Sequence, residues 1–170
     1  MVKIHITGNS GSGKTTFAAR LGAALNLPVF GLDKIVWQAG WVKTPQNLRL
    51  AKEADLIAQD RWIIEGVSAR VRHAADVIIF LDVSRYVCFK RGVLRTLRYF
   101  FRTRPELPEG CPDILILRKQ IEIIWKFKTH ARPQILDDLE AHHGKIFIVR
   151  TQADIDTVWD DIIASVRARS

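Results

Sequence analysis

The sequence predicts an α/β fold built on a five-stranded parallel sheet with helices on both faces. Short apolar runs alternate with segments of helical periodicity along the 170 residues, and this alternation implies crossover connections between parallel strands. A glycine-rich loop joins the first apolar run to the first helical segment. The composition, 48% hydrophobic and 9% aromatic, is that of a globular chain able to bury a core.

Each element follows from a local pattern. The predicted strands are short apolar runs at 2–7, 28–33, 61–66, 76–83 and 145–151. The predicted helices are 14–25, 45–60, a basic helix that carries Arg91 to Arg102, and 153–168. Phe17, Leu21 and Leu25 recur at helical spacing in the first helix, before Asn26 and Pro28 end it. The last helix turns Val158, Ile162, Ile163 and Val166 inward.

Length and cysteine content indicate one domain over 1–170 in a reduced, cytoplasmic protein. No apolar run approaches the roughly 18 to 20 residues that span a bilayer, so we expect no membrane association. The chain begins directly with a strand, without the pattern of a signal peptide. The two cysteines, Cys88 and Cys111, lie in no zinc-binding pattern. A basic stretch rich in proline and glycine predicts a lid or excursion at about 98–132.

The net charge of +8 is concentrated in one segment. Residues 85–132 contain 12 Lys/Arg against 4 Asp/Glu, whereas the rest of the chain contains 14 of each. A basic block of this kind attracts phosphates, either those of a nucleotide or those of a nucleic-acid backbone. A nucleotide and a nucleic acid are therefore both hypotheses for the ligand of this segment.

The stretch "GNSGSGKTT" predicts a phosphate-binding loop. Gly8, Gly13, Lys14 and Thr15 complete the pattern G-x-x-x-x-G-K-[ST] between a predicted strand and a predicted helix. The glycines let backbone N–H groups turn toward a phosphate, the lysine reaches the β- and γ-phosphates, and the threonine hydroxyl is a ligand for Mg²⁺. The predicted ATP-binding residues are Gly8, Asn9, Ser10, Gly11, Ser12, Gly13, Lys14, Thr15 and Thr16. The fold class is therefore that of the P-loop NTPases.

Two carboxylates end predicted strands, where ligands bind in a doubly wound sheet. Asp33 could take the proton of an acceptor hydroxyl and act in catalysis, or it could cap the helix that follows. Glu65 could hold Mg²⁺ through a water, or position the acceptor. Gly66 would allow a close approach to the acceptor.

Aromatic and basic residues extend the predicted acceptor site. Trp37 and Trp41 share a face if their stretch is helical, where they could cover the acceptor, sandwich a base or simply pack in the core. Arg70 could meet an anionic group of the acceptor or lie on the surface. The candidate acceptor residues are Asp33, Trp37, Glu65, Gly66, Arg70 and Arg132.

The basic helix carries Arg91, Arg95, Arg98 and Arg102 as one stripe at steps of 4, 3 and 4. Guanidinium groups match phosphate oxygens, so Arg91 and Arg95 are predicted catalytic residues of a lid over ATP. Arg98 and Arg102 could instead face nucleic acid, or the stripe could be a solvated surface.

Together these motifs resemble the adenylate-kinase-like small kinases, among them nucleoside monophosphate, shikimate and gluconate kinases. The resemblance includes the phosphate loop, "WIIEG" and "DVIIFLDVSRYVCFKRGVLR", and it implies that Arg91 and Arg95 stack on adenine and clamp phosphates. "GLDKIVWQAGW" replaces the arginine-containing acceptor segment of adenylate kinase. Taken together, the segments "GLDKIVWQAGW", "WIIEG" and "ARPQIL" are most similar to a branch named for DNA topology modulation.

The sequence thus predicts a kinase that transfers the γ-phosphoryl group of Mg·ATP to a small acceptor. One alternative is a nucleic-acid-associated ATPase that affects DNA topology, which the basic segment 85–132 would explain. Another is a nucleotide-dependent binding protein that transfers nothing. The identity of the acceptor stays open.

Overall fold

A five-stranded parallel sheet forms the centre of the molecule in a computed structural model that describes residues 2–99, 107–108 and 110–168. Its strands are β1 (Val2–Gly8), β2 (Val29–Gly31), β5 (Arg61–Glu65), β6 (Val77–Leu81) and β7 (Lys145–Val149). They lie in the order β2-β5-β1-β6-β7, and every neighbouring pair is parallel. The predicted five-stranded parallel sheet is confirmed.

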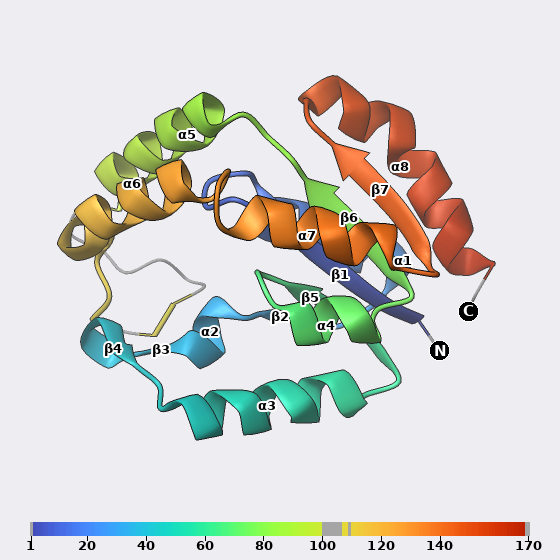
Figure 1. Ribbon diagram of the computed structural model, residues 1–170, viewed down its shortest axis with the longest axis horizontal. Helices are drawn as coiled ribbons and strands as arrows, with labels where there is room; N and C mark the ends of the chain where they lie inside the picture. Colours follow the sequence, from blue (N-terminus) through green and yellow to red (C-terminus); the bar gives the residue numbers. More distant parts are fainter. Residues whose placement is uncertain (1, 100–106, 109, 169–170) are drawn as a thin grey trace.

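Helices cover both faces of this sheet (Figure 1). They are α1 (Lys14–Leu25), α2 (Asp33–Val36), α3 (Gln46–Ala58), α4 (Ala69–Ala74), α5 (Arg85–Arg98), α6 (Leu117–Lys126), α7 (Ala131–Glu140) and α8 (Gln152–Arg167). A hairpin, β3 (Trp37–Gln38) and β4 (Val42–Lys43), encloses the 3-10 turn η1 (Ala39–Trp41), and a second turn, η2 (Asp113–Ile116), precedes α6.

The two faces of the sheet carry separate apolar clusters because successive strand residues point in opposite directions. On one face, Ile4, Ile6 and Ile79 pack with residues of α1 and α8. On the other face, Ile64 and Ile78 pack with residues of α4 and α7. All five residues of β6 are buried, as expected for a parallel strand covered on both sides.

The carboxyl ends of the strands position the functional loops. β1 ends at Gly8 directly before the phosphate loop, and β5 ends at Glu65 beside it. Figure 1 shows α5 and α6 packed side by side at one end of the molecule, beyond the sheet, and the β3–β4 hairpin at the same end. In α/β sheets, ligands bind beyond the carboxyl ends of the strands, which is where these loops lie.

The basic helix is shorter in the described chain than the arginine stripe predicted from the sequence. α5 ends at Arg98, and Arg102 lies outside the described residues. Over the described ranges, no helix has both the length and the apolar character needed to cross a membrane.

Candidate active site

The phosphate loop connects β1 to α1 and depends on its glycines. Gly8, Gly11 and Gly13 have positive φ angles of 149°, 79° and 99°. A Cβ on Gly8 would lie 2.5 Å from the Leu81 carbonyl oxygen, and one on Gly11 would lie 2.5 Å from the Cys88 carbonyl oxygen. Side chains at these positions would therefore collide with the backbone of β6 and α5, so the loop can keep its shape only with glycine.

Lys14 turns back over the loop that precedes it. Its ammonium group donates to the carbonyl oxygens of Gly8 at 2.9 Å and Asn9 at 2.8 Å. Burial lowers the pKa of Lys14, while the negative charges of Glu65 and Asp33 oppose that shift. The structure thus holds a cation in the loop with two carboxylates close enough to act on it.

Two loop residues lie beneath the binding surface and support it. Asn9 accepts a hydrogen bond from the Ser10 N–H at 2.8 Å and donates to the Ile124 carbonyl of α6 at 3.0 Å. The Ser12 hydroxyl is buried, and it has no hydrogen-bond partner among the residues that the structure describes. The other predicted loop residues line the adjoining cavity: Gly8, Ser10, Gly11, Gly13, Lys14, Thr15 and Thr16.

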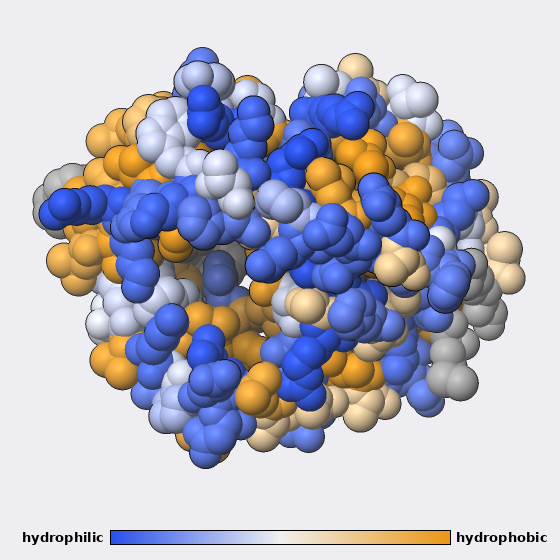
Figure 2. All heavy atoms as spheres, in the orientation of Figure 1, coloured by the Kyte–Doolittle hydropathy of each residue, from blue (hydrophilic) through white to orange (hydrophobic). Residues whose placement is uncertain are grey.

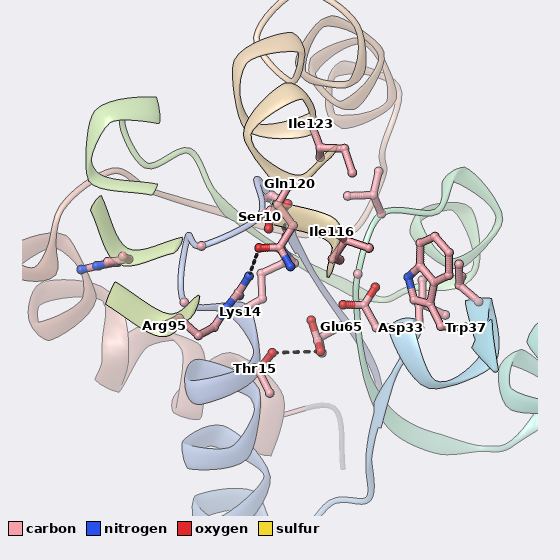
Figure 3. A pocket seen from close by; sticks show the side chains of 18 of the residues that line it. Ser10, Lys14, Thr15, Asp33, Trp37, Glu65, Arg95, Ile116, Gln120 and Ile123 are labelled. Carbon is pink, nitrogen blue, oxygen red and sulfur yellow. Dashed lines mark hydrogen bonds between the residues drawn. The ribbon is translucent and has the colours of Figure 1, made fainter. Parts of the chain in front are cut away.

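Thr15 and Glu65 form the part of the site that suits a metal ion. The Thr15 hydroxyl donates to Oε1 of Glu65 at 3.1 Å, and Glu65 is 6% exposed at the end of β5 (Figure 3). Mg²⁺ in phosphoryl-transfer sites is commonly held by one or two protein oxygens together with phosphate oxygens and waters. In the part of the chain that the structure describes, no group of three or more His, Cys, Asp or Glu could hold a metal by itself. The Thr15 hydroxyl and the Glu65 carboxylate are oxygen groups of the kind that Mg²⁺ takes as ligands.

Asp33 is the first residue of α2 and lines the same cavity as the loop. The N-cap of α2 is Leu32, and no side chain caps the helix, so the alternative of a helix-capping Asp33 is not what the structure shows. In Figure 3 the carboxylates of Asp33 and Glu65 lie between the phosphate loop and Trp37. Gly66 also lines the cavity.

Trp37 and Trp41 lie together, but not on a helix. α2 ends at Val36, and the two tryptophans occupy β3 and η1, so the condition under which they would share a helical face is not met. Their rings nevertheless meet edge to face, with centroids 5.3 Å apart, and both line the cavity. The Trp41 ring N–H donates to the Pro112 carbonyl at 3.0 Å, which fixes the hairpin against the segment that precedes η2.

Arg91 and Arg95 of α5 line the loop side of the cavity. Arg91 donates to the Ser12 carbonyl oxygen at 3.2 Å. Arg95 donates to Asp113 at 3.1 Å and to Gln120 at 2.9 Å, so it links α5 to η2 and α6. The positive charge of Arg95 also acts to lower the pKa of Lys14, which indicates that the two cations lie near one another.

Two of the predicted acceptor residues lie outside this cavity, and that expectation is corrected. Arg70 is exposed on α4 and donates to the Leu50 carbonyl oxygen of α3 at 3.1 Å. Arg132 pairs with Asp82, at 2.8 and 2.7 Å, and this partner raises the pKa of Arg132. Neither residue is among those that line the cavity. Both guanidinium groups turn toward partners in other parts of the chain, Leu50 within α3 and Asp82 directly after β6, which the sequence pattern does not reveal.

The wall formed by η2 and α6 was missed by the sequence analysis. Its cavity-lining residues are Ile116, Lys119, Gln120, Ile123 and Phe127. Four of these, at positions 116, 120, 123 and 127, recur at helical steps, so their common face was a signal in the sequence. The Lys119 ammonium lies 5.0 Å from the Trp37 ring centroid, which brings α6 and the hairpin together across the cavity.

The whole cavity has a volume of about 500 Å³ and contains both the loop and the carboxylates. Figure 2 shows the molecule hollowed between the regions of α6 and α2, with apolar side chains visible in the hollow. A volume of this size accommodates ligands of nucleotide and small-metabolite dimensions.

Solved structures share this architecture over nearly the whole chain. A shikimate kinase from Bacteroides thetaiotaomicron superposes with a TM-score of 0.57 at 18% identity, covering 96% of this chain and 97% of its own. A shikimate kinase from Acinetobacter baumannii, in complex with shikimate, gives 0.55 at 16% identity, covering 100% and 95%. An uncharacterized protein from Eubacterium ventriosum gives 0.56 at 16% identity, covering 98% and 99%.

No protein-family model and no curated protein sequence matches the chain. At these identities the structural likeness shows the fold alone. The chain therefore has the fold of the P-loop kinases, with the five-stranded parallel sheet and flanking helices that the sequence predicted.

Proposed function

We propose that this protein is an ATP-dependent phosphotransferase that acts on a hydroxyl group of a small molecule. The observation that carries the proposal is one cavity lined by the phosphate loop, by Lys14 and by the carboxylates of Asp33 and Glu65. Phosphoryl transfer requires a donor site and an acceptor site next to one another, since catalysis depends on positioning and on electrostatic stabilisation.

Several features of the loop support ATP as the donor. The glycine conformations and the helix α1 that begins at Lys14 suit a polyphosphate. Thr15 and Glu65 would hold Mg²⁺, directly or through water. Bound Mg²⁺ would neutralise part of the phosphate charge.

Different side chains of the site have different roles in the phosphoryl transfer. The acceptor hydroxyl forms a bond to the γ-phosphorus while the bond from that phosphorus to the bridging oxygen breaks, and ADP leaves. Asp33 accepts the hydroxyl proton and returns it to water. Lys14, Arg91 and Arg95 stabilise the negative charge that develops on the transferred group, and Asn9 keeps the loop in register with α6.

The solved structures support a small acceptor rather than a macromolecular one. Two of them are shikimate kinases, and one was solved in complex with shikimate. Their folds cover 96% and 100% of this chain. We extend the likeness to the class of reaction and not to the acceptor itself.

The nucleic-acid alternative rests on the basic segment, and part of that charge has partners within the protein. Arg95 pairs with Asp113, Lys126 with Glu122, and Arg132 with Asp82. Arg85 lies over the ring of Trp125, 4.9 Å from its centroid. Asp113 and Glu122 are already counted among the acidic residues of this segment, so of these contacts only the pair of Arg132 with Asp82 lowers its excess charge, and an effect on DNA topology stays a prediction.

Turnover measurements test the proposal. ADP release is followed with a panel of nucleosides, nucleotides, sugars and hydroxy acids, with and without DNA. Removing the loop cation with Lys14→Met should lower turnover by about 100- to 1000-fold, as for other donors that stabilise transition-state charge. Lys90→Met, at an exposed position of α5 outside the cavity, is the matched control. ADP release that requires DNA and no small acceptor would establish the nucleic-acid alternative instead.

A further inference from the structure

His5 is a polar side chain in an apolar layer of the sheet. It lies in the middle of β1, and its neighbours across the sheet are Ile64 of β5 and Ile78 of β6. All three residues are completely buried, and both isoleucines belong to the apolar cluster that packs with residues of α4 and α7. A polar group buried among apolar side chains costs free energy unless it is hydrogen-bonded. Departures of this kind from an apolar core are expected mainly at functional sites.

The hydrogen bond of His5 leads to the active-site cavity. Nε2 of its ring lies 3.1 Å from the carbonyl oxygen of Gly66, and Gly66 lines the cavity. A carbonyl oxygen can only accept a hydrogen bond, so Nε2 carries the ring proton and donates it. Burial, together with the positive charges of Arg72 and Lys14, lowers the pKa of His5 to about 3. The ring is therefore neutral at pH 7, with Nδ1 unprotonated.

Gly66 leads the chain out of β5, and both of its backbone groups are bonded to β1. Its N–H, one residue beyond the strand, donates to the Ile6 carbonyl oxygen at 3.0 Å. Its carbonyl oxygen accepts from the side chain of His5. Because peptide groups are planar, the first bond orients the peptide group before Gly66 and the second orients the one that leads to Val67. Val67 also lines the cavity, so His5 acts on the wall of the site from beneath it.

The same turn is connected to both carboxylates of the cavity. The Glu65 carbonyl oxygen accepts from the Leu32 N–H at 2.9 Å. Leu32 directly precedes Asp33 and lies against Gly66, where an added Cβ would meet its side chain at 2.7 Å. The two carboxylates lie between the phosphate loop and Trp37 (Figure 3). A shift of this turn would therefore displace Glu65 and Asp33 together.

We propose that His5 is a positioning residue of the phosphotransferase. Its Nε2–H holds the Gly66 carbonyl oxygen, and the turn at Gly66 then sets where Glu65 and Asp33 stand relative to the phosphate loop. His5 is not among the residues that line the cavity, so it acts through Gly66 and not on the reacting atoms. Such positioning matters because an error of about 1 Å can lower a rate by about 100-fold. The inference rests on the proposed phosphotransferase function and adds a residue to its site.

Two substitutions differ in whether they can replace the Nε2 donor. The amide nitrogen of Gln lies one bond farther from the backbone than that of Asn, so Gln reaches the position of Nε2 and Asn only that of Nδ1. The assay uses an acceptor that supports ADP release in the panel. His5→Gln should keep a kcat close to that of the unmodified protein, whereas His5→Asn should lower kcat by about 10- to 100-fold. The KM for ATP should stay unchanged in both, because the phosphate loop has its own bonds to α5 and α6.

His142→Asn is the matched control, since it makes the same replacement at the other end of the sheet. His142 lies shortly before β7 begins at Lys145, outside the cavity. Its kcat should equal that of the unmodified protein. Urea unfolding of each variant gives the folded fraction, and kcat is expressed per folded molecule, so that a loss of stability alone does not lower it. An equal fall of kcat in His142→Asn and His5→Asn would overturn the positioning role.

Nitrogen NMR of the unmodified protein tests the bond without any substitution. A ring nitrogen that carries a proton and one that does not give well-separated ¹⁵N signals, because the two nitrogens of a neutral imidazole are distinct. At pH 7 the ring of His5 should show a protonated Nε2 and an unprotonated Nδ1. A proton on Nδ1 would overturn the inference, even if His5→Asn does not fold.

The outcomes separate this inference from the proposed function. An unchanged kcat in His5→Asn would overturn the inference and leave the phosphotransferase in place. An equally low kcat in His5→Asn and His5→Gln would do the same, because the donor at Nε2 would not be what matters. No ADP release from the unmodified protein with any acceptor would overturn the proposed function itself.

Discussion

Gly66 connects the fold to the acceptor side of the site, and its replacement by alanine is a sharp test of the structure. Its φ of +142° is rarely adopted by residues with a Cβ. An added Cβ would lie 2.7 Å from Cβ of Leu32, 2.8 Å from its Cδ1 and 2.9 Å from its Cγ. The Gly66 N–H also donates to the Ile6 carbonyl at 3.0 Å, so the glycine cannot move away freely.

The cost of Gly66→Ala follows from these two effects. Strain at an unfavourable backbone conformation costs about 1 to 3 kcal/mol, and overpacking adds about 1 to 3 kcal/mol, so the free energy of unfolding should fall by about 2 to 6 kcal/mol. Because Leu32 directly precedes Asp33, relief of the collision would displace the carboxylate that lines the cavity. Acceptor turnover should therefore fall as well.

Urea unfolding measures the loss, and Gly40→Ala is the matched control. Gly40 also has a positive φ, of +69°, but a Cβ there would meet nothing within 4 Å. It should therefore cost only the conformational strain, about 1 to 2 kcal/mol. If the two variants lose the same stability, the contact between Gly66 and Leu32 is not as described and the reasoning fails.

Two further predictions concern buried charge. Burial and the positive charge of Arg72 lower the pKa of His5 from 6.5 to about 3, so the unfolded chain binds the proton more readily, and stability falls as the pH drops below 6.5. Between pH 7 and pH 5 the urea-unfolding free energy should drop by about 2 kcal/mol more in the native protein than in His5→Gln, and an equal drop would show that His5 is not buried as a neutral ring. Arg72 is 3% exposed and pairs with Asp138 at 2.5 Å, so Asp138→Ala should cost about 3 to 5 kcal/mol by leaving a buried charge unpaired. Glu122→Ala, at an exposed pair with Lys126, should leave stability essentially unchanged, and a similar loss in both variants would contradict the burial argument.

The sheet and the phosphate loop could be predicted because their signals are local. Strands such as β6 are continuous apolar runs. The spacing of Gly8, Gly13 and Lys14 by itself indicates a phosphate-binding loop. The placing of Asp33 and Glu65 beside the loop followed from one topological rule, that the ends of parallel strands meet at one edge of the sheet.

The rest of the site depends on contacts between distant segments. Trp37 and Trp41 are four residues apart, a spacing that a hairpin and a helix can both satisfy, and only the pairing of β3 with β4 distinguishes them. Arg132 is drawn to Asp82, 50 residues earlier in the chain, so its sequence context could not show its direction. α6 lines the cavity because it packs on α5. This packing could not be predicted, since the stretch of sequence before α6 has no regular pattern.

The transfer of the γ-phosphoryl group is the central claim, and labelled ATP tests it most directly. With ATP labelled in the γ-phosphoryl group and an acceptor that supports ADP release in the panel, the label should appear in the acceptor, and Lys14→Met should reduce that transfer by about 100-fold or more. Label that appears only as inorganic phosphate, or transfer that is unaffected by Lys14→Met, would contradict the account.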